Sequence, residues 1–329
     1  MNILITGGAG FIGSHLVDFL IKKSEIKKII ILDNIKDGTL KNLKIALMSS
    51  KVKFYKKDIR NYKSIKNLFK NIDQVIHLAA LSDIVPSIEF PIEYLNTNII
   101  GTVNVLESMR LNKVKKIIYA ASSSCYGIPE STPTNENNKI NTLYPYSFSK
   151  FLGEQTVQHW SEVYNINYIS LRLFNVYGTR SRTNSAYGAA IGVFLKQKLE
   201  KKPFTIVGNG QQKRDFVYVQ DVCNAFYLSL KKNVKNQIFN VGSSSPKSVN
   251  ELTNIIKGKK IFIPKRPGEP DVTYADISKI KKFLNWRPSV KFEMGIQSVL
   301  KNIEYWKTAP LWDKNKIKKA TKNWFKYLK

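Results

Sequence analysis

The sequence predicts an α/β protein built on a doubly wound parallel sheet, with a second, smaller and discontinuous domain in the C-terminal half. Three observations support this class. In the first half, short runs rich in isoleucine and valine alternate with amphipathic stretches, as in a parallel sheet covered by helices on both faces. A glycine-rich turn joins the first run to the first amphipathic stretch. Beyond residue 178 the elements shorten and loop residues become frequent.

Each expected strand of the main sheet is short, apolar and rich in β-branched residues. The six in the first half are Asn2–Thr6, Lys28–Asp33, Val52–Tyr55, Gln74–His77, Lys115–Ala120 and Asn167–Leu173. A further strand, Ile238–Val241, is expected to return to this sheet from the second half. The amphipathic stretches predict helices over Phe11–Lys23, Ser64–Lys70, Pro91–Leu111 and Tyr144–Tyr164.

The change in loop content sets the expected domain boundary. We expect one domain over residues 1–175, with returning segments near residues 215–242, and a second domain over residues 176–329 that ends in a helical tail. A chain of 329 residues would bury roughly 75% of its unfolded surface, which is enough for a large core.

The two cysteines and the N-terminus indicate a compartment. Cys125 and Cys223 lack metal-ligand spacing, so we expect neither a disulfide framework nor a metal site, and a reducing compartment is favoured. The N-terminus runs directly into a strand without an export signal. No uncharged run reaches the roughly 20 residues of a membrane span. These features together predict a cytoplasmic protein.

The net charge of +29 is large but diffuse. Only eight of the 53 basic residues are arginine, and the lysines are spread over the whole chain. Nucleic-acid surfaces usually group arginine and aromatic residues on one element, so we do not expect a nucleic-acid partner. A general compositional bias is the favoured explanation, and attraction to anionic substrates or membrane surfaces is the alternative.

The segment Thr6-Gly7-Gly8-Ala9-Gly10-Phe11-Ile12-Gly13 follows the first expected strand and opens the first expected helix. Its glycines permit a tight turn, close approach of the backbone to a pyrophosphate, and close packing of the helix on the strand. Free N–H groups and the dipole at the helix N-terminus favour an anion there. The pattern predicts a dinucleotide site in a Rossmann-type domain; the alternative is a glycine turn without a ligand.

Asp33 ends the second expected strand, 20 residues after Gly13. That spacing is typical of a carboxylate that hydrogen-bonds the adenosine ribose. Because the carboxylate would repel a 2′-phosphate, the pattern favours NAD over NADP. Asp58 and Ile59 follow the third expected strand and could reach the adenine, and helix capping by Asp58 is the alternative.

Tyr146 and Lys150 lie four residues apart in an expected helix and therefore share one face of it. A tyrosine with its usual pKa of about 10 is a poor base at neutral pH. A nearby ammonium and a positively charged nicotinamide would both favour the phenolate, so the pair is a sensible general base with its activator. Such pairs are common on helix surfaces. This one indicates a catalytic pair because it follows a dinucleotide-binding motif at the expected distance.

Ten motifs distributed over nearly the whole chain carry a family resemblance. They are TGGAGFIG (6–13), HLAA (77–80), NTNIIGT (96–102), ASSSCYG (121–127), YSFSK (146–150), RLFNVYG (172–178), RDFVYVQDV (214–222), FNVG (239–242), RPGE (266–269) and ADISK…LNWRP (275–288). On these motifs the sequence resembles the extended short-chain dehydrogenase/reductase family of NAD-dependent nucleotide-sugar epimerases and dehydratases. The resemblance is strongest to UDP-glucose and UDP-N-acetylglucosamine 4-epimerases.

The resemblance implies a role for each matching residue. Tyr146 would be the base acting on a sugar hydroxyl, and Lys150 would hold the nicotinamide ribose and tune Tyr146. Ser122 would hydrogen-bond both Tyr146 and the hydroxyl being oxidised. The residues implied in NAD binding are Gly7, Gly10, Phe11, Ile12, Gly13, Asp33, Asn34, Asp58, Ile59, Leu78, Ala79, Ala80, Asn98, Tyr146 and Lys150.

The resemblance also implies a set of substrate-binding residues. Asn175, Arg214 and Arg266 would hold the nucleotide diphosphate, because arginine forks suit phosphate oxygens. The alternative for Arg214 is an ion pair with Asp215 or Asp221, and for Arg266 a plain loop cation. The full set implied in substrate binding is Ser82, Ser122, Ser123, Tyr146, Asn175, Arg214, Arg266, Glu269 and Thr273.

The two serines after Ser122 are informative because they are not acids. The family's dehydratases carry Asp and then Glu at the positions of Ser123 and Ser124, and its decarboxylases carry Glu at Ser124. A hydroxyl is a poor general acid or base for these reactions. The resemblance therefore favours 4-epimerisation of a UDP-hexose or UDP-N-acetylhexosamine through a transient 4-keto sugar. A 4,6-dehydratase or another sugar-nucleotide oxidoreductase is the alternative.

The choice of sugar depends on a few positions. Thr273 occupies the family's pocket-size position, where a small residue would admit an N-acetyl group, but a shift by one residue would place Tyr274 there and reverse the inference. Ser82 and Ser87 could contact the sugar or be ordinary loop residues. Phe204 could stack on the base or belong to the core.

The loop after Gly178 offers further candidates. Arg180 and Arg182 could contact phosphate or be solvated. Ser185–Ala190 precedes an expected helix where the pyrophosphate and uracil could bind.

The tail after Trp312 holds seven lysines and one aspartate around an apolar stripe that includes Ile317 and Trp324. It could contact an anionic membrane surface, where sugar polymers are assembled, which would suit an enzyme of cell-surface polysaccharide biosynthesis. We favour the alternative, that it folds back on its own core or on a neighbouring subunit. The resemblance also implies a homodimer formed through a four-helix contact of Pro91–Leu111 and Tyr144–Tyr164.

Overall fold

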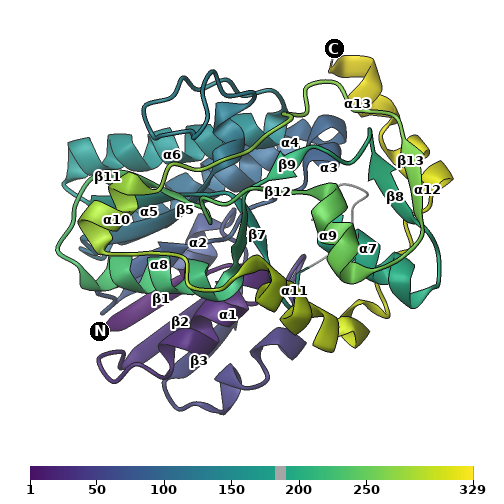
Figure 1. The fold of residues 1–329 in the computed structure, drawn as a ribbon. Helices are drawn as coiled ribbons and strands as arrows, with labels where there is room; N and C mark the ends of the chain where they lie inside the picture. The colour runs from purple at the N-terminus through teal and green to yellow at the C-terminus, as the bar shows by residue number, and fades with distance from the viewer. Residues whose placement is uncertain (182–189, 329) are drawn as a thin grey trace.

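The structure is a computed structural model that describes residues 1–181 and 190–328 (Figure 1). Its central sheet has seven parallel strands in the order β11-β6-β5-β4-β1-β2-β3. The expected α/β class with a doubly wound parallel sheet is confirmed. The strands are β1 (Asn2–Thr6), β2 (Lys28–Asp33), β3 (Val52–Lys56), β4 (Gln74–His77), β5 (Lys116–Ser122), β6 (Asn167–Leu173) and β11 (Gln237–Val241).

The strand order reverses beside β1, which has β2 on one side and β4 on the other. Ligands of open α/β sheets bind at such a reversal, at the carboxyl ends of the strands. The returning strand β11 pairs with β6, as expected. The strand β5 runs to Ser122, two residues beyond its expected end, because these residues continue the ladder with β6 up to the pair Ser122 and Leu173.

Helices cover both faces of this sheet, because neighbouring residues of each strand point to opposite faces. In β1, Ile3 and Ile5 belong to one buried cluster, and Leu4 belongs to another. The helices of this part of the chain are α1 (Phe11–Leu20), α2 (Tyr62–Ile65), α3 (Ile84–Glu89), α4 (Pro91–Leu95), α5 (Gly101–Leu111), α6 (Pro145–Tyr164), α8 (Val219–Lys231) and α10 (Ser278–Leu284).

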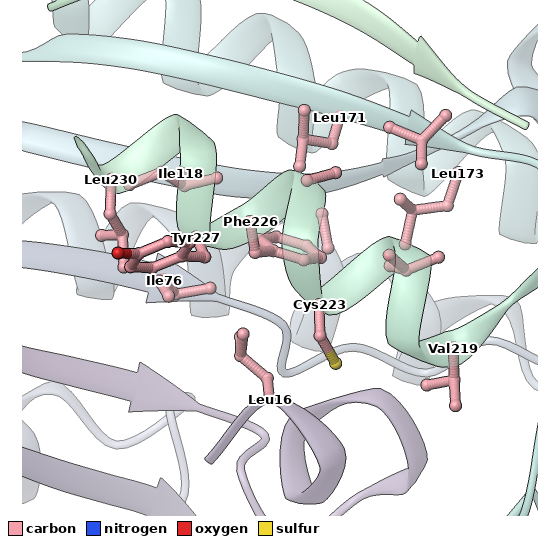
Figure 2. Packing of buried hydrophobic residues seen from close by; sticks show 14 of the residues in the cluster. Leu16, Ile76, Ile118, Leu171, Leu173, Val219, Cys223, Phe226, Tyr227 and Leu230 are labelled. Atoms are coloured by element: carbon pink, nitrogen blue, oxygen red, sulfur yellow. The ribbon is translucent and has the colours of Figure 1, made fainter. Parts of the chain in front are cut away.

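The helix α8 shows how one face is packed (Figure 2). Its apolar side chains recur every three to four residues, which places Cys223, Phe226 and Leu230 on one side of the helix. They lie against strand residues such as Ile118 and Leu171, all within one buried cluster. A segment from beyond residue 175 thus takes part in the buried cluster on one face of the central sheet.

The single helix expected over Pro91–Leu111 is interrupted. A π-helical turn, Asn96–Ile100, separates α4 from α5. Within this turn the buried Asn98 bonds a neighbouring loop, as described below. Hydrophobic periodicity does not distinguish an α-helical turn from a π-helical one, and π turns often occur at functional sites.

A second group of elements packs around its own buried cluster, which includes Tyr177, Phe194, Phe204 and Trp306. Phe204 is fully buried there against Phe194, so its side chain belongs to the core rather than to a base-stacking surface. The strands are β7 (Asn175–Tyr177), β8 (Phe204–Val207), β9 (Lys213–Arg214), β10 (Phe216–Tyr218), β12 (Lys247–Ser248) and β13 (Lys260–Ile263). The helices are α7 (Ala190–Leu199), α9 (Val249–Ile256), α11 (Phe292–Lys301), α12 (Lys314–Ala320) and α13 (Lys322–Tyr327).

The basic tail folds back on its own chain. Ile317, Thr321 and Trp324 are buried, whereas the lysines of α12 and α13 are exposed. Figure 1 shows α12 beside β13 and α13 close to α3. No described helix is both long enough and apolar enough to cross a bilayer.

Candidate active site

The glycine turn after β1 brings the start of α1 close to the sheet. Gly7 has φ +71°, a conformation that L side chains rarely adopt. A Cβ atom on Gly13 would lie 2.2 Å from the Gly7 carbonyl oxygen, so only glycine allows this approach. At Gly10 a Cβ atom would meet only that same oxygen, at 3.3 Å, which leaves its other side open. The turn therefore presents the N-terminus of α1 to an open space.

Asp33, at the end of β2, closes the other side of this space. It is 7% exposed, and its carboxylate accepts hydrogen bonds from the backbone N–H groups of Ala9 and Ile35, at 2.9 and 2.8 Å. Burial raises the pKa of Asp33, and these two bonds oppose the rise. Each carboxylate oxygen holds one of these bonds and keeps further acceptor capacity for a ribose hydroxyl.

Asp58 and Asn34 lie together at the far end of the same space, 3.0 Å apart through the Asn34 amide. Arg60 pairs with Asp58 at 2.7 Å, and its hydrogen bonds hold the pKa of Asp58 down at about 2. The cap of α2 is Asn61, which accepts from the Ser64 N–H. The capping alternative for Asp58 is therefore wrong.

A cavity of about 420 Å³ occupies this space at the carboxyl ends of β1, β2, β4 and β5. Its walls combine a helix N-terminus for a diphosphate, a carboxylate for a ribose and apolar residues for flat rings, so the site fits a dinucleotide. The predicted residues that line it are Gly7, Gly10, Phe11, Ile12, Gly13, Asp33, Asn34, Asp58, Ile59, Leu78, Ala79, Ala80, Ser82, Ser122, Tyr146 and Lys150.

Asn98 is not among the lining residues, although it was expected there. Its amide bonds the backbone N–H and C=O of Leu81 and the hydroxyl of Ser149, at 2.8 to 3.0 Å. Because these bonds use the amide's oxygen and nitrogen, Asn98 acts on the site indirectly. It joins the loop after β4, which lines the cavity, to the helix α6 that carries Tyr146.

The hydroxyls of Tyr146, Ser122 and Ser124 form a short chain. The Tyr146 phenol donates to Ser122 Oγ at 3.2 Å, and Ser122 Oγ lies 2.8 Å from Ser124 Oγ. Ser122 also accepts from the Ser124 N–H, because it caps the 3₁₀ turn Ser123–Tyr126. The end of β5 and the first turn of α6 thus place a phenol and two hydroxyls beside the cavity.

Lys150 lies one helical turn after Tyr146 and is buried. Its ammonium sits 4.4 Å from the centre of the Tyr119 ring, a favourable cation–π contact. Burial lowers the pKa of Lys150 to about 7, and the carboxylate of Glu154 opposes this fall. At neutral pH the amine therefore carries only part of a positive charge in the protein alone.

The pKa of Tyr146 is raised above its usual value by removal from water, and the hydrogen bond with Ser122 opposes the rise. The carboxylate of Asp83 raises it further. Lys150 is not among the groups that shift the pKa of Tyr146 in the protein alone, so the expected lowering by its ammonium is not found there. These groups keep the phenol protonated at neutral pH.

A second cavity, of about 170 Å³, lies beside the first and shares Val176 with it. The predicted substrate residues Asn175, Arg214, Arg266 and Glu269 all line it. Two arginines, two side-chain amides and one carboxylate surround this small hollow, and the arginine forks suit an anionic group.

Glu269 brings the two arginines together. Its carboxylate pairs with Arg214 at 2.6 Å and lies 3.8 Å from Arg266. The alternative pairing of Arg214 with Asp215 or Asp221 is wrong. Asp215 accepts from the backbone N–H groups of residues 243, 244 and 275, and Asp221 accepts from those of residues 289 and 290.

Thr273 is not among the lining residues of either cavity, but it contacts one of them. Its hydroxyl donates to the Asn175 amide oxygen at 3.1 Å and accepts from the Asp215 N–H at 3.1 Å. The residue expected to set the sugar pocket is therefore joined directly to one expected to hold the nucleotide.

The remaining candidates fall outside both cavities. Ser123 is not among the lining residues. Ser87 is buried and donates to the Ile84 carbonyl at 2.6 Å. Arg180 pairs with Asp18 at 2.7 Å. Arg182 and residues 185–189 lie outside the described residues.

The structure adds lining residues that sequence reasoning missed. Asp83 and Phe174 line the first cavity, and Gln212 and Ile317 line the second. Phe174 directly follows the expected strand Asn167–Leu173, so its position at a strand end was a usable signal, and Asp83 directly follows the candidate Ser82. Ile317 comes from the tail, and only the tertiary structure brings it to this cavity.

Comparisons with known proteins give a consistent result. A family model described as GDP-mannose 4,6 dehydratase matches residues 4–299. A UDP-glucuronate 4-epimerase from Thermodesulfobacterium geofontis is 36% identical over 309 residues, covering 89% of this chain and 93% of that protein.

Two solved structures are similar throughout. The UDP-glucuronic acid 4-epimerase of Bacillus cereus, in complex with UDP-glucuronic acid and NAD, is 33% identical with a TM-score of 0.85, and the match covers 92% of this chain and 99% of that one. The UDP-N-acetylglucosamine 4-epimerase of Methanobrevibacter ruminantium, in complex with UDP-N-acetylmuramic acid, is 31% identical with a TM-score of 0.86, and covers 91% and 97%. The expectation of NAD as the cofactor is confirmed.

Proposed function

The chain belongs to the family described as GDP-mannose 4,6 dehydratase, among the extended short-chain dehydrogenases/reductases, and we propose that it is an NAD-dependent enzyme that epimerises a nucleoside-diphosphate sugar at C4. The observation that carries the proposal is the hydrogen bond between Tyr146 and Ser122 beside the dinucleotide cavity, in a serine segment that holds no carboxylate. Oxidation and re-reduction at one carbon require a proton acceptor there and no further acid.

Tyr146 and Ser122 would handle the proton of the C4 hydroxyl. The residues that line the first cavity would hold NAD, which would supply a reversible hydride acceptor for C4 and a positive charge beside the phenol. The Ser122 hydroxyl orients the sugar hydroxyl, and the phenol oxygen of Tyr146 accepts its proton and later returns it. The protein's own groups raise the pKa of Tyr146. Proton acceptance by its phenol oxygen would therefore be favoured only when NAD and the sugar nucleotide are bound.

Arg214 and Arg266 would hold the diphosphate while the sugar turns. The two guanidiniums, joined by Glu269, line the second cavity next to the catalytic one. An anchored diphosphate leaves the 4-keto sugar free to present its other face without leaving the enzyme. Positioning of this kind is the main contribution a protein makes to such a reaction.

We infer a UDP-sugar as the substrate class, because the similar epimerases named above act on UDP-sugars. The position of Thr273 against Asn175 supports a role in sugar selection, since a threonine leaves more room there than an aromatic residue. UDP-hexoses and UDP-N-acetylhexosamines are both included in the proposal.

The test is a product screen with UDP-glucose, UDP-N-acetylglucosamine and UDP-glucuronate, without added cofactor. The proposal expects the matching C4 epimer and no net rise of absorbance at 340 nm. Release of a stable 4-keto sugar would instead support a 4,6-dehydratase. Tyr146→Phe is the control: it should retain NAD and lose turnover, since it lacks only the phenol oxygen.

A further inference from the structure

The C-terminal tail, residues 307–328, crosses from the second domain to the catalytic helix. These residues come after residue 299, where the family match ends. Its first part is tied to α7: Lys196 Nζ donates to the Lys307 carbonyl and Gln197 Nε2 to the Trp312 carbonyl, both at 2.6 Å. Its middle part packs through Ile317 onto Ile263, in the wall of the second cavity.

Trp324, on α13, makes the last contact of this path. Its side chain is 1% exposed, and its Nε1–H donates to the Pro267 carbonyl at 2.8 Å. Pro267 directly follows Arg266, one of the two arginines of the second cavity. A buried indole whose polar atom is bonded gives both packing area and a fixed direction.

The other face of Trp324 meets the start of the catalytic helix. Its ring lies 5.9 Å from that of Tyr144, and the Tyr144 ring is stacked on that of Tyr146 with 5° between their planes and 6.4 Å between centroids. One side chain thus touches the loop behind Arg266 and the aromatic neighbour of the catalytic tyrosine. The helix α13 also contacts α3, where Glu89 lies near Asn323.

We propose that Trp324 is a positioning residue that holds the Arg266–Pro267 loop against the Tyr144–Tyr146 pair. The inference rests on the proposed function and extends it to a segment outside the family match. In an epimerase the 4-keto sugar must rotate to present its other face while its diphosphate stays fixed relative to Tyr146. The indole links the group that holds the diphosphate to the group that handles the proton, and so keeps their separation constant.

Loss of this link has two expected consequences. The Arg266–Pro267 loop would sample more positions, so the diphosphate would bind more weakly. The 4-keto sugar would also leave before re-reduction in a fraction of turnovers. The hydride from C4, which carries two electrons, then stays on the cofactor. The hydroxyl proton passes through Tyr146 to solvent, and a 4-keto sugar nucleotide is released.

The test compares Trp324→Ala and Trp324→Phe with Phe325→Ala, a matched change of a half-exposed aromatic residue on the same helix. The probe is UDP, whose affinity is measured by calorimetry on the NAD-loaded protein, so that this readout does not depend on turnover. For Trp324→Ala we expect UDP affinity to fall roughly tenfold, the size of one lost buried hydrogen bond with its packing. The UDP affinity of Trp324→Phe should fall less, and Phe325→Ala should bind UDP with the affinity of the unchanged protein.

A second readout uses UDP-glucose, UDP-N-acetylglucosamine and UDP-glucuronate. Trp324→Ala should raise KM more than it lowers kcat and should build up absorbance at 340 nm during turnover. Unchanged UDP affinity in Trp324→Ala, or equal losses in Trp324→Ala and Phe325→Ala, would overturn the inference. If the alanine variant melts at a much lower temperature, Trp324→Phe decides by the same criteria. Failure of the unchanged protein to epimerise any of the three sugars counts against the proposed function alone, because the measurement of UDP affinity does not depend on turnover.

Discussion

At the scale of single residues, the proposed chemistry of the site depends on three hydroxyl groups in contact. Tyr146 donates to Ser122, and Ser122 lies 2.8 Å from Ser124. The three consecutive serines thus have different surroundings. Ser122 contacts the phenol of Tyr146, Ser124 contacts Ser122, and the Ser123 side chain makes no hydrogen bond with another described residue. The contact with the Ser124 hydroxyl restricts the direction in which the Ser122 hydroxyl points.

Alanine substitutions of the three serines should therefore differ in a set order. Ser122→Ala should lower kcat by about 100-fold or more, the usual loss for a group that takes part in proton transfer. Ser124→Ala should cost roughly two- to tenfold, the range for one neutral hydrogen bond. Ser123→Ala should stay close to the unchanged enzyme. Steady-state rates on the accepted UDP-sugar measure this order, and equal losses at all three positions would contradict it.

Lys150 leads to a prediction about pH and stability. Its pKa is about 7 in the folded protein and close to 10.5 in the unfolded chain, so the unfolded state binds more protons between these values. The free energy of unfolding should therefore fall as the pH falls from about 10.5 to about 7. In cofactor-free protein, Lys150→Met should raise the melting temperature relative to the unchanged protein more at pH 7 than at pH 10. The exposed Lys307→Met is the matched control and should give a small, pH-independent change; the same small change in Lys150→Met would refute the prediction.

At the scale of elements, α6 positions Tyr146 and Lys150, the proposed catalytic groups, because one of its faces is fixed to the sheet. Tyr146, Lys150 and Glu154 follow one another at intervals of four residues. Glu154 forms a buried ion pair with Arg172 of β6 at 2.6 Å and accepts from the Ser170 hydroxyl at 2.7 Å. The sequence suggests this face of the helix, but it does not identify Arg172 as the partner, since the two residues are brought together only by the packing of α6 against β6.

Removing one member of this pair should destabilise the protein strongly. Glu154→Gln leaves the Arg172 guanidinium buried without a counter-charge, and such a change typically costs about 3–5 kcal/mol. Glu304→Gln removes a carboxylate from an exposed pair with Lys307 and should cost less than about 1 kcal/mol. Urea unfolding of both variants measures the two free energies. Similar values for the two would show that the Glu154–Arg172 pair does not fix α6.

At the scale of the whole molecule, the site lies between two groups of elements and beside an apolar outer face. The first cavity belongs to the seven-stranded sheet, and the second lies among β7, β9, α7 and the tail. Ile92 and Ile100, around the π-helical turn, are 70% and 50% exposed, and Phe148 on α6 is 44% exposed. These residues lie within the two segments expected to form a four-helix contact between subunits, so the proposed homodimer would cover them.

A charge within this face should separate the subunits. We expect Ile100→Glu to convert a dimer into a monomer, because a carboxylate at the centre of an apolar contact loses its hydration without gaining a partner. Met294→Glu, a matched change of an exposed apolar residue on α11, should leave the dimer intact. Sedimentation equilibrium distinguishes the outcomes. A monomeric unchanged protein, or a dimeric Ile100→Glu variant, would remove this face from the proposal.

The sequence by itself determined the local features of this protein. The strands, the glycine turn at Gly7, the spacing of Asp33 and the pair Tyr146 and Lys150 all follow from patterns within short segments, because periodicity and backbone conformation are local properties. The tertiary structure alone decided which distant groups meet. The pairing of Arg214 with Glu269, the contact of Thr273 with Asn175 and the position of Trp324 against Pro267 and Tyr144 join segments far apart in the chain. Such contacts depend on how whole elements pack, and the sequence pattern of one segment does not identify the segment that packs against it.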